Sequence, residues 1–239
     1  MTNEGPFPLS SVKFFLRDIS RGMIKSWEEV FSDVSNFDIS YGDYFGKTAD
    51  AIISPANSFG SMDGGVDQRI TDYFGWQLQD RLREKIQNSL HGELPVGKAY
   101  IIDTRTKFSK IKYCISAPTM RVPKDVSTSM KAYLAFRACL IAIEEHNKRA
   151  FQESENEKKK KKNKKDLLTP ITSVLCCGLG TAVGRMSYDM CARQMYEAYK
   201  IMVIKNENKI PFPQNLDQVL LQQKNLCVTN NELVKEFFY

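Results

Sequence analysis

Histidine is scarce in this sequence, and long apolar runs are missing from it. The two histidines, His91 and His146, lie in polar stretches near expected helix ends, and we interpret both as surface residues. A zinc site or a Ser-His-Asp hydrolase is therefore hard to build, and we expect neither a bound metal nor a cofactor. No run of about 18 or more uncharged apolar residues occurs, so we expect no membrane-spanning segment.

The N-terminus also lacks the basic start and apolar block of a secretory signal. We therefore predict an intracellular protein, cytoplasmic or nuclear and not secreted. The cysteines form no C-x-x-C pair and lie mostly in apolar segments, which indicates buried free thiols. They are Cys114, Cys139, Cys176, Cys177, Cys191 and Cys227.

The composition is that of a globular protein. Of 239 residues, 42% are hydrophobic, 11% aromatic and 26% charged, which suits one sizeable α/β domain. We expect residues 1–239 to form a single domain. No apolar stripe is left over for a partner, so we expect a monomer.

The positive charge is concentrated in one block. Lys158–Lys165 holds seven lysines, whereas the whole chain has a net charge of +6, so the remainder carries −1. The stretch 152–166 contains no apolar residue and predicts a disordered insertion. Such a block can act as a nuclear localisation signal or contact a polyanion weakly. Because the body of the chain is not basic, we expect no other contact with nucleic acid.

Strands and helices are expected to alternate along the chain. Apolar or alternating runs predict strands at 12–16, 34–41, 49–54, 97–103, 112–117 and 171–177. Apolar residues at helical spacing predict helices over 23–31, 66–74, 127–146 and 191–202. This order argues for an α/β sandwich around a mostly parallel or mixed sheet. We expect an N-terminal β–α extension at about 10–33 and a peripheral segment at 211–239.

Two polar loops in the first half of the chain follow predicted strands, beyond whose carboxyl ends ligands bind in open α/β sheets. Asp43 can accept a hydrogen bond from an exocyclic amine such as that of adenine, or else bond its own turn. The run 50–67 leads through Asn57 to Gly64–Gly65 and a helix start, whose N–H groups attract phosphate or ribose oxygens. Alternatively, Asn57 satisfies turn groups and Asp67 complements the helix dipole.

A third loop, Gly178–Gly184, has three glycines in seven residues between a strand and a helix. Its backbone N–H groups are suited to wrapping a pyrophosphate. It is not a P-loop, because no Lys-Ser or Lys-Thr follows the last glycine. A Rossmann interpretation is disfavoured, because no second strand with an acidic end follows about 20 residues later. A glycine-rich connector without a ligand is the remaining alternative.

Taken together, these loops resemble the signature of the macrodomain family. The matching elements are Gly42-Asp43-Tyr44, the run from Asp50 to Asn57, the run from Gly64 to Asp67, and Gly178–Gly184. The resemblance spans about 34–202 and looks like a divergent branch with a Ser-Pro-Ala-Asn-Ser-Phe-Gly first loop. It implies a three-layer α/β/α sandwich, with a central mixed, mostly parallel sheet, that binds ADP-ribose.

The resemblance also implies roles for residues. Asp43 would accept from the adenine amine, the 178–183 loop would hold the diphosphate, and Asn57 and Asp67 would position the distal ribose and a water as catalytic residues. The implied ADP-ribose-binding residues are Asp43, Tyr44, Asn57, Gly64, Gly65, Val66, Gly178, Leu179, Gly180, Thr181, Ala182, Val183 and Gly184.

Three departures from the family pattern bear on turnover more than on binding. Ser54 stands in place of the first Asn, Asp63 in place of the first of three glycines, and Ala182 where many members keep glycine. An Ala methyl there would crowd an attacking water. We therefore favour hydrolysis of an ADP-ribosyl linkage, on a protein or a small derivative, and keep a non-catalytic reader of ADP-ribose as the alternative. A nucleic-acid adaptor acting through the lysine block is a third interpretation.

Overall fold

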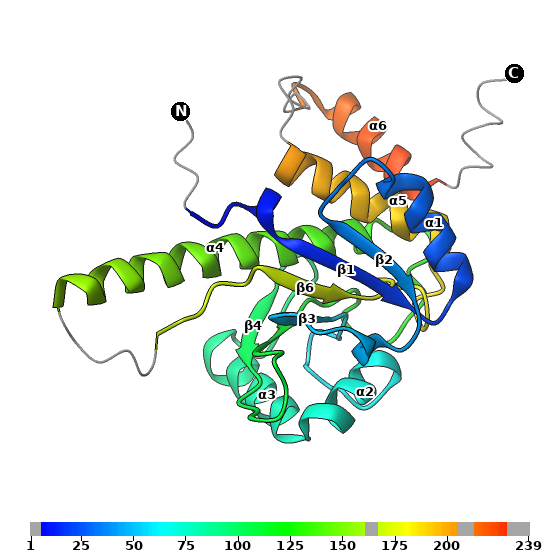
Figure 1. The fold of residues 1–239 in the computed structure, drawn as a ribbon. Helices are drawn as coiled ribbons and strands as arrows, with labels where there is room; N and C mark the ends of the chain where they lie inside the picture. The colour runs from blue at the N-terminus through cyan, green and yellow to red at the C-terminus, as the bar shows by residue number, and fades with distance from the viewer. Residues whose placement is uncertain (1–5, 161–166, 205–212, 229–239) are drawn as a thin grey trace, which may run out of the picture.

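The fold is a mixed six-stranded sheet covered by helices on both faces (Figure 1). The computed structural model describes residues 6–160, 167–204 and 213–228. The strand order is β2-β1-β6-β3-β5-β4, and every neighbouring pair is parallel except β4 with β5. The strands are β1 Lys13–Asp18, β2 Phe37–Tyr41, β3 Ala51–Ser54, β4 Tyr100–Asp103, β5 Tyr113–Ser116 and β6 Ser173–Cys176. The predicted α/β class with a mostly parallel sheet is confirmed.

Two hydrophobic cores, one on each face, make the fold three-layered. In β3, Ala51 and Ile53 belong to one core and Ile52 to the other, as the two-residue period of a strand requires. Figure 1 shows α2 and α3 on one side of the sheet and α1 and α5 on the other. The helices are α1 Arg21–Phe31, α2 Gly65–Phe74, α3 Gln77–Ser89, α4 Lys131–Lys160, α5 Tyr188–Tyr199 and α6 Leu216–Cys227. Two short 3₁₀ helices, η1 Leu9–Ser11 and η2 Tyr44–Gly46, and a π-helix, η3 Lys200–Ile204, complete the described elements.

The segment expected to form an N-terminal extension instead supplies a central strand. β1 lies between β2 and β6, with Phe14 opposite Phe37 on one side and Val174 on the other. The Phe14 ring is fully buried and stacks on Phe37 at 5.0 Å between centroids. Strand β1 is therefore an interior strand of the sheet and not an appendage to it.

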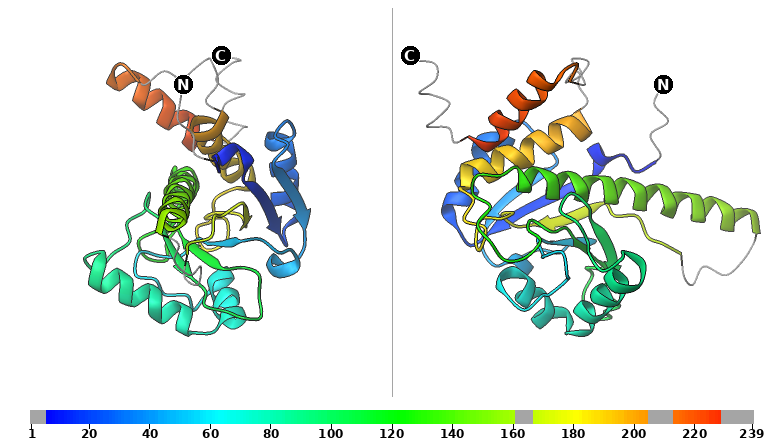
Figure 2. Two further views of the ribbon diagram at one scale, coloured as in Figure 1. Left: turned by 60° about the vertical axis from the view of Figure 1, so that its left-hand side comes forward. Right: turned by 180° about the vertical axis from the view of Figure 1, so that it is seen from behind.

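Helix α4 is longer than expected and takes up part of the predicted disordered insertion. Residues 152–160 continue the helix to Lys160, whereas 161–166 lie outside the described residues. Gln, Glu and Lys are good helix formers, so this polar stretch can extend a helix without burying an apolar face. Figures 1 and 2 show the end of α4 projecting beyond the sheet.

His146 is buried, contrary to its interpretation as a surface residue. Its Nε2 lies 2.9 Å from the Thr169 carbonyl oxygen, and burial lowers its pKa. The neighbouring Asn147 exchanges two hydrogen bonds with the backbone of Ile171. These two side chains fasten α4 to the segment that enters β6, which explains a polar pair inside the core.

The remaining sequence expectations concern thiols and membranes. Five cysteines are buried and free, and Cys227 is partly buried. None of the helices within 6–160, 167–204 and 213–228 has both the length and the apolar character needed to cross a membrane. Helix α6 rests on α5 through the buried Leu226, whose carbonyl accepts from Gln194 Nε2 at 2.7 Å.

Candidate functional site

The carboxyl ends of the five parallel strands share one edge of the sheet, as the sequence analysis assumed. Strands β3 and β6 pair through only two residue pairs, Ala51 with Val174 and Ile52 with Leu175, and separate before they reach this edge. The loop that contains Asn57 follows β3, and the glycine loop follows β6. The fold therefore brings both loops to neighbouring strands at the same edge.

Tyr44 occupies the place where β3 and β6 cease to pair. Its buried hydroxyl lies 2.7 Å from the Ile53 carbonyl oxygen and 3.0 Å from the Leu175 carbonyl oxygen, and donates to one at a time. Burial raises the pKa of this phenol well above its usual value. The Tyr44 ring is thus a structural bridge beneath the site and is not exposed for stacking on a base.

Replacing Tyr44 with phenylalanine should lower the free energy of unfolding by about 1–2 kcal/mol, because the carbonyls lose a buried donor. Urea unfolding measures this difference. Tyr73→Phe is the matched control, since the Tyr73 hydroxyl makes no hydrogen bond within the described chain, and it should stay within about 0.5 kcal/mol of the parent. Equal stability of Tyr44→Phe and the parent would contradict the bridging role.

Asp67 turns into the protein at the start of α2 and meets the end of β3. It is 9% exposed, and Ser54 Oγ donates to its Oδ1 at 2.5 Å. Burial raises the pKa of this carboxyl to about 7, although the Ser54 hydrogen bond lowers it; the exposed Asp63 nearby raises it further. Ser54, which departs from the family pattern, is therefore the direct partner of Asp67.

Asn57 is used largely by its own loop. Its Nδ2 donates to the Ser61 carbonyl at 2.8 Å, and its Oδ1 accepts from the backbone N–H groups of Phe59 and Ser61. One hydrogen on Nδ2 is left for a ligand, because an amide nitrogen carries two. The alternative in which Asn57 satisfies turn groups thus describes most of its bonds.

Open space surrounds the glycines at the start of α2. A Cβ atom built on Gly64 or Gly65 would meet no heavy atom within 4 Å. Gly65 has a φ of +57°, a conformation that favours glycine. No side chain caps this helix start, so its first N–H groups are available to an anion.

The glycine loop after β6 presents unused donors. Within the described residues, the backbone N–H groups of Gly180, Thr181, Ala182 and Val183 donate no hydrogen bond. The ends of the loop are fixed, since Met186 N–H donates to the Gly180 carbonyl at 3.0 Å and Val126 N–H to the Gly184 carbonyl at 2.9 Å. The loop is therefore held in shape while its middle remains free to bind an anion.

Asp43 already has partners. Its Oδ1 accepts from the Phe45 N–H at 2.9 Å, and its Oδ2 pairs with Arg69, with half of the side chain exposed. Its carbonyl also accepts from Arg17 Nε at 2.6 Å. An adenine amine would therefore compete with Arg69 for this carboxylate.

Comparison with known proteins bears on these loops together. The Macro domain family profile matches residues 53–195, from β3 to α5. The chain belongs to the macro domain family. The match includes Asn57, Asp67 and the glycine loop but not Asp43.

Individual relatives of this macro domain are distant. An uncharacterized protein of Aquifex aeolicus (strain VF5) is 33% identical over 149 residues, which is 62% of this chain and 72% of that protein. The macrodomain of Mycobacterium tuberculosis DarG has a TM-score of 0.50 at 17% identity, covering 67% of this chain and 88% of its own. The Oceanobacillus iheyensis macrodomain with ADP has a TM-score of 0.47 at 18% identity, covering 82% and 90%. The likeness to the DarG macrodomain shows the fold.

Two polar residues at the carboxyl edge of this macro domain escaped the sequence analysis. Asp18 ends β1, and its Oδ2 accepts from the Gly178 N–H at 3.1 Å. Ser116 ends β5 in register with Ser54, and its hydroxyl is buried without a hydrogen-bond partner among the described residues. Their position at the last residue of an apolar strand was the available signal. Asp18 was overlooked because its strand was assigned to an extension.

Metal ligands are not gathered at this edge. Within the described parts of the chain, no three His, Cys, Asp or Glu side chains lie close enough together to hold an ion. The polar groups that the structure places at this edge are backbone N–H groups, hydroxyls and the carboxyls of Asp18, Asp43 and Asp67.

Proposed function

We propose that this macro domain binds ADP-ribose and hydrolyses an ADP-ribosyl linkage, on a modified protein or on a small derivative such as O-acetyl-ADP-ribose or ADP-ribose 1″-phosphate. The observation that carries the proposal is the set of free N–H groups from Gly180 to Val183. They follow β6, whose neighbour β3 leads into the loop before Asp67. A diphosphate needs several such donors at once, and backbone donors held in a fixed loop lose little entropy on binding.

The proposal gives each loop one part of the ligand. The diphosphate lies on the glycine loop between Gly178 and Gly184, and the open faces of Gly64 and Gly65 let the distal ribose approach the start of α2. The free Nδ2 hydrogen of Asn57 reaches that ribose. Asp43 or Asp18 accepts from the adenine amine at the other end of the edge.

Asp67 supplies the general base in the proposed reaction. A water oxygen forms a bond to the anomeric carbon of the distal ribose, while the bond from this carbon to the leaving atom breaks and its electron pair stays with that atom. The water proton passes to the Asp67 carboxylate. A base whose pKa is about 7 is well matched to this task near neutral pH, and such catalysis typically contributes about 10²- to 10⁴-fold.

Two measurements on the full chain test the proposal. Titration calorimetry with ADP-ribose should give saturable binding, and incubation with a mono-ADP-ribosylated protein should release ADP-ribose detectable by chromatography. Absence of binding would remove the whole proposal. Binding without release from any ADP-ribosyl substrate would remove only the hydrolase.

A reader that binds ADP-ribose without cleaving it is the second candidate, and two observations favour it. Asp67 is enclosed and hydrogen-bonded by Ser54, and Asn57 is mostly occupied by its own loop. Asp67 is therefore less accessible to a bound water than a general base needs to be, and Asn57 has only one Nδ2 hydrogen left for the ribose. Single-turnover assays with excess protein separate the candidates, since a slow enzyme releases ADP-ribose under these conditions and a reader does not.

If Asp67 is the base, Ser54→Ala should shift the pH dependence of turnover. The Ser54 hydroxyl stabilises the ionised carboxyl and so lowers its pKa; without it the pKa rises. The rising limb of the pH–rate profile, centred near 7 in the parent, should move to higher pH. Ser116→Ala is the control, because its hydroxyl makes no bond to Asp67, and its midpoint should not move. If the rising limb of the pH–rate profile stayed in place in Ser54→Ala, ionisation of Asp67 would not control the rate.

A further inference from the structure

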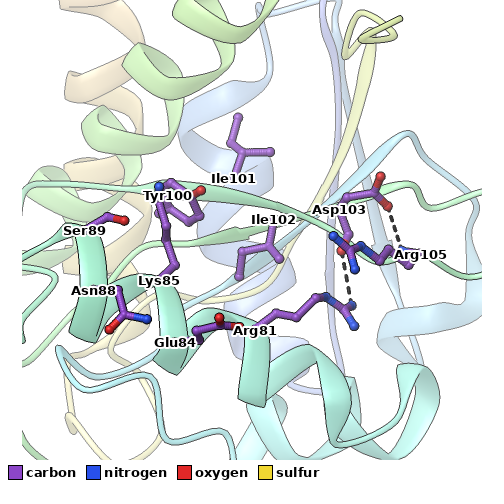
Figure 3. Close-up of a pocket in the computed structure, with 10 residues that line it drawn as sticks. All are labelled: Arg81, Glu84, Lys85, Asn88, Ser89, Tyr100, Ile101, Ile102, Asp103 and Arg105. Atoms are coloured by element: carbon purple, nitrogen blue, oxygen red, sulfur yellow. Dashed lines mark hydrogen bonds between the residues drawn. The ribbon is translucent and has the colours of Figure 1, made fainter. Parts of the chain in front are cut away.

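A cavity of about 300 Å³ lies away from the glycine loops, between α3 and the edge strand β4 (Figure 3). Arg81 and Lys85 of α3 line one wall, and Arg105, just after β4, lines the other. Two carboxylates, Glu84 and Asp103, also line the cavity. Cations therefore outnumber carboxylates around this space.

The cations of this cavity are only partly balanced: Lys85 Nζ lies 5.5 Å from the centroid of the Tyr100 ring, whereas the two guanidinium groups have no such contact in the described part of the chain. Arg81 donates to the carbonyls of Asp103 and Thr104, but its Nε is buried without a partner among the described residues. Burial and the neighbouring Arg105 guanidinium lower the pKa of Arg81, although the carboxylates of Asp103 and Asp80 act in the opposite direction. Neither Arg81 nor Arg105 forms an ion pair within 6–160, 167–204 and 213–228. Two adjacent unpaired guanidinium groups favour an anion between them.

The loop that follows β4 extends this charge. Lys107 and Lys110 lie in the same connector as Arg105, and both side chains are exposed. We call Arg81, Lys85, Arg105, Lys107 and Lys110 the basic patch. The net charge outside the lysine block is only −1, so the sequence did not indicate this patch. The residues of the patch come from two segments that only the fold brings together.

Exposed aromatic rings accompany the basic patch. Phe108 is 69% exposed within the same connector, and its ring centroid lies 5.7 Å from that of Tyr73, which is 38% exposed. Trp76, at the start of α3, is 47% exposed. Cations interleaved with exposed rings are the combination that binds single strands, since phosphates meet the cations and bases stack on the rings.

We propose that the basic patch and the rings of Phe108 and Trp76 bind a segment of single-stranded nucleic acid, with Tyr73, which stacks on Phe45 at 4.1 Å, supporting Phe108 from below. This second surface is independent of the ADP-ribose site. An acidic protein segment would pair with the cations, but its carboxylates would not stack on aromatic rings. The exposed rings therefore favour a nucleic acid, whose bases do stack on them.

The test is fluorescence anisotropy of a labelled oligothymidine with the full chain, over a series of salt concentrations. The patch variant is Arg105→Asn with Lys107→Gln and Lys110→Gln; asparagine suits the φ of +53° at position 105. Loss of three phosphate contacts should lower affinity and reduce the slope of log K against log salt by about 2, at about 0.7 per contact. Phe108→Ser should lower affinity by about fivefold or more without changing the slope.

Matched controls separate this surface from general charge. Lys25→Gln with Lys98→Gln and Lys124→Gln removes the same charge from exposed positions elsewhere and should leave affinity nearly unchanged. Replacing the lysines of Lys158–Lys165 with glutamine should leave the effect of Phe108→Ser intact. Thermal unfolding by circular dichroism verifies that each variant is folded. The proposal is overturned if the control triple weakens binding as much as the patch variant, if the lysine block alone accounts for binding, or if heparin or a duplex binds as tightly as the single strand.

Discussion

Replacing Gly184 with alanine is expected to lower the affinity for ADP-ribose by at least about tenfold. A Cβ atom at this position would lie 2.4 Å from the Gly180 carbonyl oxygen and 2.6 Å from Val126 Cγ2. The first neighbour is backbone, so the methyl group cannot be accommodated by a side-chain rotation. The loop must open, and the N–H groups from Gly180 to Val183 then lose their common orientation. Titration calorimetry with ADP-ribose measures the loss.

The same substitution should also destabilise the fold, by about 1–3 kcal/mol, as overpacking of a tight site usually does. Gly92→Ala serves as the matched control. Gly92 has a φ of +90°, so alanine is strained there, yet its Cβ would meet no atom within 4 Å and the position lies outside the candidate site. Gly92→Ala should lose stability and keep its ADP-ribose affinity. If Gly184→Ala binds as the parent does, the glycine loop is not the diphosphate site.

The meeting of the three loops was predictable because of a general property of parallel sheets. Strands that run in one direction place their carboxyl ends at one edge, so the loops after β2, β3 and β6 had to approach each other. The sequence spacing of apolar runs was enough to find these strands. Asp67 could also be singled out, since it falls in the first turn of a helix that opens at two glycines.

What Asp67 and Asp43 contact could not be predicted from spacing. The Ser54–Asp67 hydrogen bond joins a strand end to a helix start, and the Arg69–Asp43 pair joins α2 to the turn after β2. Both depend on how α2 docks on the sheet, which local sequence does not specify. The sequence therefore predicted Asp67 as a polar residue at the site, whereas its enclosure and raised pKa follow from packing alone.

The place of β1 was missed for a related reason. A short apolar run such as 12–16 indicates a strand but carries no information on which strands it pairs with. Its central position follows from two-sided pairing with Phe37 and Val174, residues far apart in sequence. This error hid Asp18, which shares the carboxyl edge only because β1 lies beside β6.

Asp67→Asn is expected to reduce release of ADP-ribose by about 10²-fold or more while leaving ADP-ribose affinity within a few-fold. Asparagine has nearly the same shape and still accepts from Ser54, but its amide cannot take a proton from water. Single-turnover release and calorimetry give the two quantities separately. Asp72→Asn, which removes an exposed carboxylate from the same helix, is the control and should change neither. Unchanged release by Asp67→Asn would exclude Asp67 as the base.

The same variant should be more stable than the parent at high pH. Because the folded-state pKa of Asp67 is raised from 3.8 to about 7, the folded protein holds this proton more tightly than the unfolded chain does. Stability of the parent is therefore lost as pH rises from about 4 to about 7, by an amount on the order of 4 kcal/mol. Asparagine does not titrate, so the advantage of Asp67→Asn should grow by about 2.5 kcal/mol between pH 5 and pH 8. Denaturant unfolding at several pH values measures it, and a difference that is independent of pH would mean that the buried carboxyl is not held protonated by the fold.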